Sequence, residues 1–487
     1  MTISEARIDI LPDPLPLVGG ARLTSVSGND YSHMYPATGR ATVTVPMAGA
    51  DDVDLAIVTA RAACGQWAQI APPQRRQLLF DLADAIEAHA EELTAIQVIE
   101  NGMPSMIAGL HLQAVGEMLR YNGGWADKTT GDLNPAWPGP ALDYSVMEPY
   151  GVVAIIVPWN SPLFCLGSVL GAALASGNCV VIKPPELAPF STLRIAELAL
   201  AVGFPPGVIN VVPGDGVVGA ALVAHNGINK IHFTGSGATA TRILQSAAVN
   251  LTPVATELGG KSPNIIFDDV DLDAAAFHAT AFCMQVSGQG CINGTRVLVQ
   301  DSVHDEVVER IKAAVALFAP GDPALPETMF GPVINHAAMT RITGYIERAK
   351  ENKAGTLVTG GSRAGGDFAH GFYIEPTVFA DVDPSSEIAR SEIYGPVMSV
   401  MKFTDEHDAL RQANDTAYGL ASYLQTTNLS RAHRMAGQLD VGMVWVNGLG
   451  FPPSIPFGGV KGSGTGRIGG LAGIHEFCRT KNVWVSL

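Results

Sequence analysis

Short apolar runs alternate with helix-forming segments between residues 151 and 258, and this alternation constrains the fold more than any other feature of the chain. Strands are predicted at 152–157, 179–182, 209–212, 230–233 and 253–256, and helices at 164–175, 191–201, 217–225 and 238–248. Strands and helices that alternate across short connections favour a parallel, doubly wound sheet. Because ligands bind at the carboxyl ends of the strands in such sheets, the residues after each strand are the first candidates for a binding site.

The segments on either side extend the α/β pattern. Helices are predicted at about 51–66, after the Pro-Pro pair at 72–73, at 91–100 and over 105–128. A second alternating region begins near residue 262, with strands at 264–267 and 296–299 and helices at 273–287 and 303–317. The polar, proline-rich stretch 129–149 and the β-rich tail at 480–485 stand apart from this pattern. We expect the tail to pair with a neighbouring subunit, and the stretch 129–149 either to do the same or to be a simple connector.

The composition and charge of the chain disfavour several classes of protein. The net charge of −16 argues against nucleic-acid binding, which normally needs a basic surface. The first ten residues carry acidic side chains and no apolar segment, and no apolar run reaches membrane-spanning length, so we expect a cytoplasmic protein. The six cysteines show no Cys-x-x-Cys spacing and no histidines at zinc spacing, which predicts reduced thiols and no metal site.

Two acidic side chains in the predicted loops are candidates for the acid that binds the ribose of a dinucleotide. The stretch 235–240 (Gly-x-Gly-x-x-Ala) follows a strand and opens a helix, as do turns that present backbone N–H groups to a pyrophosphate. A tight turn without a ligand fits the same pattern. The simple fingerprint makes Glu257, about 20 residues further on, the ribose-binding acid. Glu186, which follows Lys183 at the end of the neighbouring strand, is the alternative.

Cys291 lies in a segment, 285–296, that places little side-chain bulk around its sulfur, because glycine and glutamine precede it and another glycine follows. A structural cysteine normally has bulky apolar neighbours. A nucleophilic cysteine needs an approachable sulfur and local dipoles that stabilise its thiolate. We interpret the other five cysteines as small packed hydrophobes and Cys291 as the candidate nucleophile.

Seven motifs, in family order along the chain, resemble those of the NAD(P)-dependent aldehyde dehydrogenase superfamily. They are Val-Pro-Trp-Asn (157–160), Lys-Pro-Pro-Glu (183–186), Phe-Thr-Gly-Ser (233–236), Glu-Leu-Gly-Gly-Lys-Ser-Pro (257–263), Gly-Gln-Gly-Cys (288–291), Glu-Ile-Tyr-Gly-Pro-Val (392–397) and Pro-Phe-Gly-Gly-Val-Lys-x-Ser-Gly (456–464). The resemblance implies an α/β fold with an NAD-binding domain at 1–128 and 150–261 built on the doubly wound sheet. It also implies an α/β catalytic domain at 262–455. The segments 129–149 and 456–487 would form a β oligomerisation arm and a C-terminal bridging segment, in a homodimer or homotetramer.

By the same resemblance, the chain is an NAD-dependent enzyme that oxidises an aldehyde to its carboxylic acid. Cys291 would attack the aldehyde to form a thiohemiacetal. The Asn160 side chain and the Cys291 backbone N–H would hold its oxyanion, and Glu257 would activate the water that cleaves the later thioester. The cofactor would be held by Ile156, Trp159, Lys183, Glu186, Gly216, Ser236, Glu392 and Tyr394. A carboxylate at Glu186 would repel the 2′-phosphate of NADP, so NAD is the predicted cofactor.

One position departs from the family pattern. Many relatives carry an acid implicated in proton relay directly after the arginine at 467, where this chain has Ile468. Glu257 thereby loses a partner, and its route to bulk water is left open. His475 and Glu476 lie nearby in the sequence, but the sequence gives no basis for placing them in the site.

The positions that line the substrate tunnel of relatives correspond here to Ala114, Ser161, Phe164, Cys165, Ser168, Gln285, Phe451 and Phe457. Several of these side chains are small, and the loop 448–455 carries no charge. We expect a roomy, mostly apolar pocket for a bulky aromatic or terpenoid aldehyde, or alternatively an ordinary tunnel filled by other side chains.

Two other functions fit parts of the sequence. A CoA-acylating semialdehyde dehydrogenase usually lacks the base at the Glu257 position. A non-catalytic binding or structural relative would not need Cys291, Glu257 and Asn160, which are all present.

Overall fold

The alternating apolar runs form one eight-stranded sheet in the computed structural model, which describes residues 3–487. Its central strands are β7 (Val152–Ile156), β8 (Cys179–Lys183), β9 (Ile209–Val211), β10 (Lys230–Gly235) and β11 (Val254–Leu258). They are parallel and lie in the order β11-β10-β7-β8-β9, so the chain order reverses between β7 and β10. The predicted doubly wound sheet is thus confirmed, and the reversal marks the place where such sheets bind ligands.

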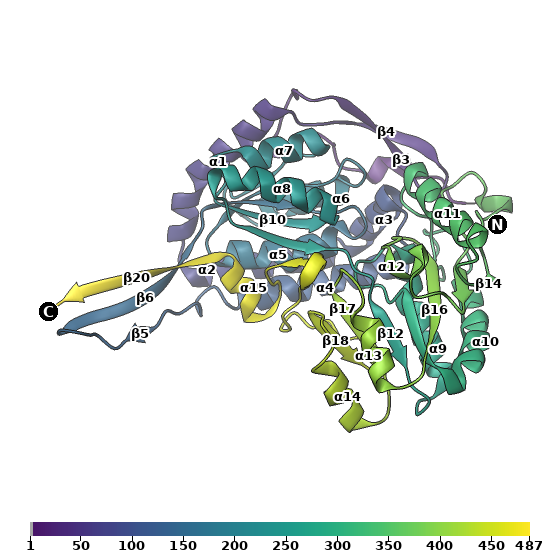
Figure 1. Ribbon diagram of the computed structural model, residues 1–487. Helices are drawn as coiled ribbons and strands as arrows, with labels where there is room; N and C mark the ends of the chain where they lie inside the picture. Colours follow the sequence, from purple (N-terminus) through teal and green to yellow (C-terminus); the bar gives the residue numbers. More distant parts are fainter. Residues whose placement is uncertain (1–2) are drawn as a thin grey trace.

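Helices cover both faces of this sheet (Figure 1). One layer consists of α1 (Ala50–Gln69), α7 (Gly216–Ala224) and α8 (Gly237–Asn250). The other layer consists of α2 (Pro72–Ala88), α4 (Ser105–Gly123), α5 (Pro162–Ala175), α6 (Phe190–Ala201) and α15 (Gly470–Glu476), and α3 (Ala90–Asn101) packs beside it. Short antiparallel strands extend the edges: β1 (Leu17–Val18) and β2 (Ala21–Arg22) beyond β9, and β19 (Gly464–Thr465) beyond β11. The hairpin β3 (Asp30–Tyr35) and β4 (Arg40–Pro46) lies against α3.

The second alternating region forms a seven-stranded sheet in the order β14-β15-β16-β13-β12-β17-β18. Its strands are β12 (Pro263–Ile266), β13 (Arg296–Gln300), β14 (Thr356–Thr359), β15 (Thr377–Ala380), β16 (Val397–Phe403), β17 (Ala421–Gln425) and β18 (Met443–Val446). Its helices are α9 (Leu272–Met284), α10 (His304–Val315), α11 (His336–Glu351), α12 (Glu387–Arg390), α13 (Glu406–Asn414) and α14 (Leu429–Ala436). All neighbouring strands are parallel except β14 and β15. The sheet belongs to a separate lobe, at the lower right of Figure 1.

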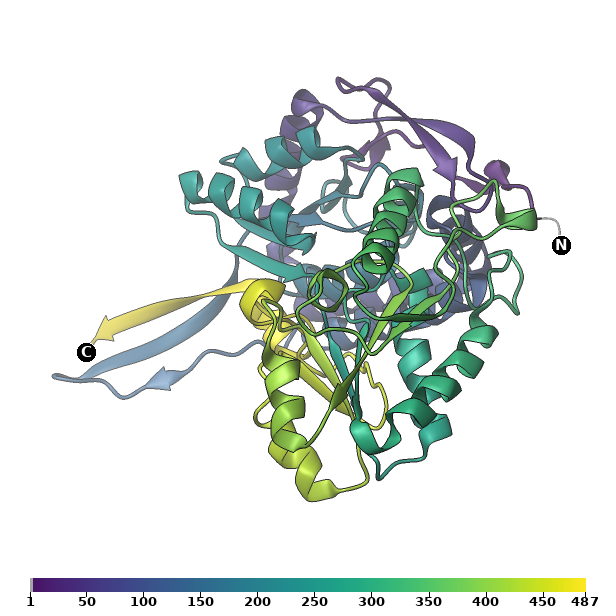
Figure 2. The same ribbon diagram turned by 45° about the vertical axis from the view of Figure 1, so that its right-hand side comes forward.

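A three-stranded arm projects from the body in both views (Figures 1 and 2). It contains β5 (Leu133–Asn134), β6 (Ala141–Pro149) and β20 (Cys478–Ser486), in the order β20-β6-β5. The tail was expected to pair with a neighbouring subunit, whereas β20 here pairs with β6 of its own chain from Cys478–Pro149 to Ser486–Ala141. Each strand is nine residues long, so their backbone groups match over the full length. The other edge of β20 has no strand beside it among residues 3–487.

The helix predicted at 273–287 is shorter than expected. It ends at Met284, and a 3₁₀ turn (Gln285–Gly288) follows. Val286 and Ser287 have φ values of 51° and 53° there, a left-handed conformation that an α-helix cannot contain. No helix formed by residues 3–487 is both long enough and apolar enough to span a bilayer.

Arg296 links the start of β13 to the residue Lys261, just before β12, and to the end of α13. Its side chain is buried, and its guanidinium donates to the carbonyl oxygens of Lys261 (2.7 Å), Gln412 (3.0 Å) and Ala413 (2.9 Å). The substitution Arg296→Met leaves these carbonyls without a donor. We expect it to lower the free energy of unfolding by about 3 kcal/mol or more, as measured by urea denaturation.

Arg348→Met is the matched control, because it removes an exposed guanidinium paired with Glu387. Exposed ion pairs contribute little, so this variant should unfold as the wild type does. Equal effects of the two substitutions would contradict the assignment of Arg296 as a buried link.

Candidate active site

Three neighbouring cavities follow the carboxyl ends of the parallel strands, and Cys291 lines two of them. The outer cavity, of about 410 Å³, and the middle cavity, of about 330 Å³, share the wall 158–159 and the turn 234–236. The inner cavity, of about 200 Å³, is the third. The side chains common to the middle and inner cavities are Asn160, Cys165, Thr234, Glu257, Leu258 and Cys291. The three proposed catalytic side chains therefore lie together between these two spaces.

The outer cavity is lined by six of the residues that the sequence predicted for cofactor binding: Ile156, Trp159, Lys183, Glu186, Gly216 and Ser236. Lys183 ends β8, and burial lowers the pKa of its ammonium to about 8 although Glu186 and Asp215 oppose the shift. Ser236 caps α8 by accepting a hydrogen bond from the Thr239 N–H (3.3 Å), so the helix begins at the cavity wall.

The two acids that are candidates for the ribose position line different cavities. Glu186 lines the outer cavity, whereas Glu257 lines only the middle and inner ones. This placement favours Glu186 for the ribose position over Glu257, which the simple fingerprint selects and which lies beside Cys291.

The middle cavity is lined by the two expected residues of the second lobe, Glu392 and Tyr394. Glu392 Oε1 accepts a hydrogen bond from the Gly260 N–H (3.1 Å), and the Tyr394 ring meets that of Trp159 edge-on with centroids 5.5 Å apart. Arg341 on α11 also lines this cavity and donates to the Ile393 carbonyl oxygen. Sequence reasoning missed Arg341, because it lies about fifty residues from Glu392 and carries no local motif.

The turn before Cys291 is packed too tightly for ordinary side chains. Gly288 has φ 75°, and a Cβ there would overlap the backbone of Gly395 and Pro396. Asn293 closes the loop, since its Nδ2 donates to the carbonyl oxygens of Cys283 (3.0 Å) and Gln285 (3.1 Å). Val286 and Ser287 in the same turn have left-handed backbone conformations. Such conformations are strained in residues other than glycine, and they concentrate at functional sites. The strained turn presents the Cys291 side chain to the cavities.

Burial raises the pKa of the Cys291 thiol to about 12, and the carboxylates of Glu392 and Glu257 add to the shift. The N–H groups of Cys291 and Ile292 act in the opposite direction. The dipoles expected from the sequence are therefore present, but burial outweighs them. Without a further positive charge in the site, this shift favours the thiol form of Cys291 over the thiolate that nucleophilic attack requires.

Glu257 is buried at the end of β11 with 4% of its surface exposed. Burial raises the pKa of its carboxyl well above the usual value; Arg467 opposes the shift and Glu476 adds to it. Its Oε2 has no hydrogen-bond partner among residues 3–487. A buried carboxyl with a raised pKa and a free oxygen is suited to accept a proton at neutral pH.

Asn160 is held at the boundary of the middle and inner cavities. Its Nδ2 donates to the Gln289 carbonyl oxygen (2.9 Å). Behind it, the Asn101 side-chain amide donates to the carbonyl oxygens of Trp159 (3.1 Å) and Asn160 (3.3 Å). The amide is thus fixed beside the two residues that precede Cys291.

The inner cavity has a mostly apolar wall. Of the expected wall residues, Ser161, Phe164, Cys165, Ser168, Gln285, Phe451 and Phe457 line it. The Phe451 ring centroid lies 5.3 Å from that of Phe164 and 5.0 Å from that of Phe457. Leu449 and Ile468, which were not expected in the wall, line it as well.

One expected wall residue, Ala114, is not among the side chains that line the inner cavity. His111, one turn earlier on α4, lines it instead, and its ring centroid is 5.0 Å from that of Phe164. The longer side chain reaches the space that the methyl group of Ala114 does not. Burial lowers the pKa of His111 to about 4, so the ring is neutral at pH 7.

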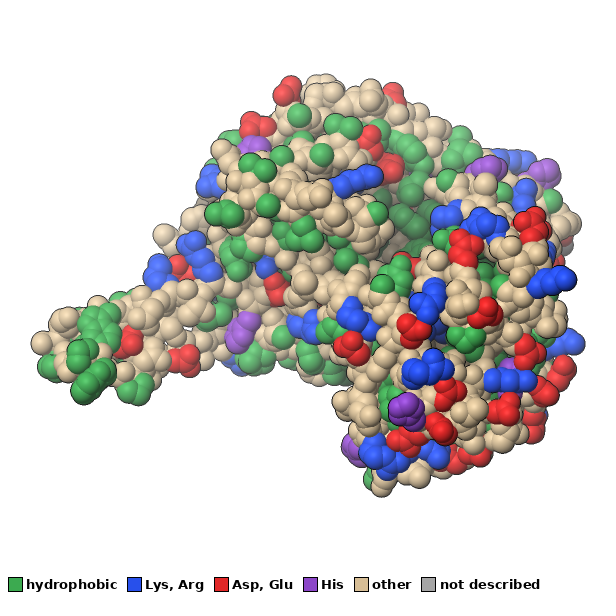
Figure 3. Space-filling model, viewed as in Figure 1, with side chains coloured by type: hydrophobic (Ala, Val, Ile, Leu, Met, Phe, Trp, Pro, Cys, Tyr) green, Lys and Arg blue, Asp and Glu red, His purple; other side chains and the backbone are tan. Residues whose placement is uncertain are grey.

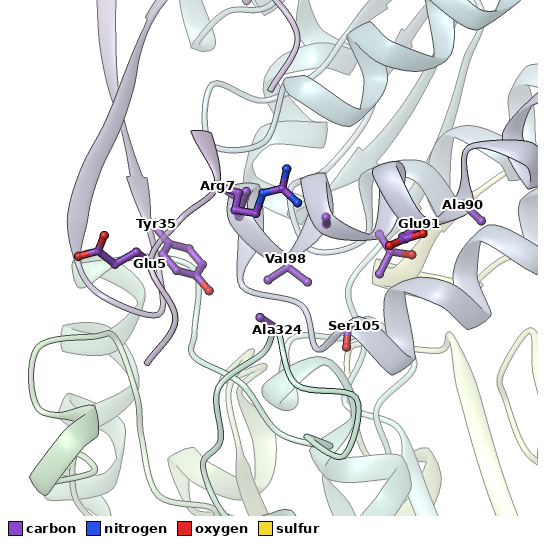
Figure 4. A pocket seen from close by; sticks show the side chains of 11 residues that line it. Glu5, Arg7, Tyr35, Ala90, Glu91, Val98, Ser105 and Ala324 are labelled. Atoms are coloured by element: carbon purple, nitrogen blue, oxygen red, sulfur yellow. The ribbon is translucent and has the colours of Figure 1, made fainter. Parts of the chain in front are cut away.

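A separate cavity of about 370 Å³ lies between the N-terminal segment and α3 (Figure 4). Its wall combines Val98 and other small apolar side chains with Glu5, Arg7 and Glu91. It contains neither a cysteine nor any residue that follows a central strand. The candidate chemistry is therefore confined to the three neighbouring cavities.

Comparison with known proteins matches this geometry. The sequence pattern described as "Aldehyde dehydrogenase family" matches residues 23–483. An aldehyde dehydrogenase of Alternaria alternata is 40% identical over 469 residues, which cover 95% of this chain and 93% of that protein. A structure of PnpE in complex with nicotinamide adenine dinucleotide superposes with a TM-score of 0.95, at 40% identity and 98% coverage of both chains. P. syringae AldA, an indole-3-acetaldehyde dehydrogenase determined as a mutant with NAD⁺ and IAA, gives a TM-score of 0.95 at 36% identity, covering 98% of this chain and 97% of AldA. The chain belongs to the aldehyde dehydrogenase family.

Proposed function

We propose that this protein oxidises a bulky, uncharged aldehyde to its carboxylic acid with NAD, through a covalent intermediate on Cys291. The observation that carries the proposal is that Cys291, Glu257 and Asn160 line both the middle and the inner cavity, while the outer cavity shares a wall with the middle one. Membership of the family supports the reaction class. The residue roles below are our assignments.

The residues of the outer and middle cavities fit NAD. The Lys183 ammonium and the Glu186 carboxylate offer a donor and an acceptor for ribose hydroxyls, and the start of α8 offers backbone N–H groups to a pyrophosphate. Gly216 leaves open space where a Cβ would stand. PnpE and AldA, whose structures contain NAD, support the choice of cofactor. When bound, NAD supplies the hydride acceptor and a positive charge next to the middle cavity.

Cys291 forms the bond to the substrate. Its thiol must lose a proton before attack, and its pKa is raised, so a base or a nearby positive charge has to assist. The sulfur then adds to the aldehyde carbon to give a tetrahedral thiohemiacetal. Its oxyanion is held by the Asn160 amide and the Cys291 N–H, which are rigid donors in a site with little water.

Glu257 serves the second half of the reaction. After hydride leaves the tetrahedral carbon, the acyl group remains on Cys291 as a thioester. Glu257 takes a proton from the water that attacks this thioester, for which its raised pKa and unpaired Oε2 suit it. The presence of this base favours hydrolysis over transfer of the acyl group to CoA, and it disfavours a non-catalytic relative.

The inner cavity supports an apolar, aromatic substrate. Three phenylalanine rings form its wall, the only ionisable side chains there are Glu257, His111 and the two thiols, and His111 is neutral. A substrate carboxylate would find no cation in this wall. AldA, whose name states an indole substrate, supports an aromatic aldehyde.

We assign residues 1–128 and 150–261 to NAD binding, 262–455 to the catalytic domain, and 129–149 and 456–487 to the arm and bridging segment of a dimer or tetramer. The tip of the arm supports the last role, because hydrophobic side chains gather there (Figure 3). They include Trp137, 83% exposed, and Leu487, 83% exposed. The bridging segment also adds β19 to the NAD-binding sheet, so it contributes to more than the arm.

Cys291 and Glu257 are expected to affect different steps. Cys291→Ala should abolish NADH formation, because no thiohemiacetal can form. Glu257→Gln should still release a burst of NADH and then turn over at least about 100-fold more slowly, because the acyl-enzyme is no longer hydrolysed. Stopped-flow absorbance at 340 nm measures both phases. Cys64→Ala, far from the cavities, is the control, and full activity of Cys291→Ala would contradict the mechanism.

Release of the free acid in the absence of CoA separates hydrolysis from the CoA-acylating alternative. The hydrolytic rate should also fall as the pH decreases through the raised pKa of Glu257, above the range of an ordinary carboxyl, since only the deprotonated base accepts a proton.

Glu186 is expected to set the preference for NAD over NADP. The wild type should show a kcat/KM for NAD at least about 10-fold above that for NADP, because the carboxylate repels a 2′-phosphate. Glu186→Gln should lower this ratio, mainly by raising kcat/KM for NADP. Equal kcat/KM values for both cofactors in the wild type would contradict the assignment.

Substrate charge is expected to decide which aldehydes are used. Benzaldehyde or phenylacetaldehyde should give a kcat/KM at least about 10-fold above that of succinic semialdehyde, because burying an unpaired carboxylate is costly. Steady-state NADH production at saturating NAD measures the ratio. A preference for the acidic aldehyde would show that a cation outside the described wall receives the carboxylate.

A further inference from the structure

A line of polar side chains runs along one face of β10 beneath the active site. Successive strand residues point to opposite faces, so Lys230, His232 and Thr234 share one face. Thr234 lines the inner and middle cavities, and its Oγ1 lies 3.3 Å from Nε2 of His232. Lys230 and His232 are 4% and 1% exposed. Central parallel strands normally carry apolar residues, so three polar side chains in a row require an explanation.

The Glu257 carboxyl joins this line at its upper end. In the parallel pairing of β10 with β11, Thr234 lies beside Glu257 and His232 beside Ala255. Paired residues of neighbouring strands point to the same face. Glu257 and Thr234 are therefore neighbours on the face that carries His232.

Glu476 lies at the other end of this row of side chains, beside Lys230. It is the last residue of α15, its Oε1 accepts a hydrogen bond from Lys230 Nζ, and its Oε2 accepts one from the Arg467 N–H (3.2 Å). A Cβ on Gly466 would lie 2.9 Å from Oε2 of Glu476 and 3.0 Å from Cβ of Ala255, which places this carboxylate close to the same face. The side chain of Glu476 is 17% exposed and that of Lys230 is 5% exposed. Glu476 is thus the member nearest to solvent.

Glu257 needs a route by which it can release a proton to solvent. When water attacks the thioester, one O–H bond of the water breaks and the proton passes to Glu257. The C–S bond then breaks, the acid leaves, and the sulfur remains on Cys291 as a thiolate. Glu257 must lose its proton before the next turnover. Ile468, at the position where relatives carry an acid, cannot accept it and lines the inner cavity instead.

We propose that Thr234, His232 and Glu476 carry the proton of Glu257 to solvent, in place of the acid that is absent at position 468. The inference rests on the proposed hydrolytic function. Each member accepts a proton at one atom and releases one from another, so no net charge stays in the sheet. Thr234 and His232 are joined directly, whereas no hydrogen bond among residues 3–487 joins Glu257 to Thr234 or His232 to Glu476, so a water molecule has to bridge each of these two steps. His232 Nδ1, which is buried and without a partner, is the atom that passes the proton to the second water. Lys230 holds Glu476 in place.

The charges around the line are compatible with this role. Burial, together with the Lys230 ammonium, lowers the pKa of His232 to about 3, so the ring is neutral. Glu257 faces Arg467 and Glu476, and its negative charge also acts on the thiols of Cys165 and Cys291. Glu476 raises the pKa of Glu257. A variant that lacks the Glu476 charge therefore distinguishes an electrostatic effect on Glu257 from a role in proton transfer. A purely electrostatic role would move the pH profile to lower pH, whereas loss of a relay lowers the rate at every pH.

The test measures the decay of the acyl group on Cys291 directly. Wild type, Glu476→Gln and His232→Leu are mixed with NAD and limiting benzaldehyde, quenched at intervals and analysed by intact-protein mass spectrometry between pH 6 and 9. Both variants should form the acyl-enzyme at the wild-type rate and lose it about 10-fold more slowly across the whole range, consistent with the contribution of a proton-transfer group. Glu197→Gln is the matched control, because it removes a partly buried carboxylate paired with Arg22 away from the site.

The outcomes are distinct. Deacylation within twofold of the wild type in both variants, a loss in only one of them, or a mere shift of the pH profile would overturn the relay. Absence of any acyl-enzyme in the wild type with every aldehyde tested would instead overturn the proposed function. Two independent variants keep the test decisive if one of them does not fold.

Discussion

The register between β10 and β11 is the constraint on which the site depends. It places Thr234 beside Glu257 at the carboxyl ends of two parallel strands, next to β7, which leads into Asn160. Parallel pairing cannot shift by one residue without moving every side chain to the other face. Glu257, Asn160 and the turn at 234–236 are therefore positioned by the same backbone hydrogen bonds that hold the sheet together. Cys291 comes from the second lobe, as Glu392 and Tyr394 do, and lies on a turn that packs against Gly395 and Pro396.

Desolvation dominates the chemistry of the site. Burial raises the pKa values of both Cys291 and Glu257, because each charged form would lose its hydration. Two buried anions side by side would be costly. The raised thiol pKa limits unwanted reactions of Cys291, since only the thiolate is strongly nucleophilic. Under the proposed function, the positive charge of the bound cofactor would favour the thiolate.

Much of this arrangement could be predicted from the sequence, and the errors have physical causes. The five central strands, the cavity-lining loops and Cys291 follow local patterns that one chain segment contains by itself. The helix predicted over 273–287 was too long, because periodicity cannot detect the left-handed conformation of Val286 and Ser287. Ala114 was placed in the wall in place of His111, because side-chain reach depends on the packing of α4 against α5. Arg341 and Glu476 could not be placed at all, since only tertiary contacts bring them near Glu392 and Lys230.

Because position 468 carries an apolar residue, the residues proposed for substrate binding and those proposed for proton release are largely different. Ile468 and the phenylalanines line the inner cavity, where we place the aldehyde, whereas the polar face of β10 and Glu476 lie behind Glu257. Substitutions at Ile468 or the phenylalanines can therefore reshape the inner cavity while Glu257, His232 and Glu476 stay unchanged. Under the proposed relay, substrate recognition and proton release then rest on partly different residues, so the cavity can be adapted to a new aldehyde while the route of the proton is kept.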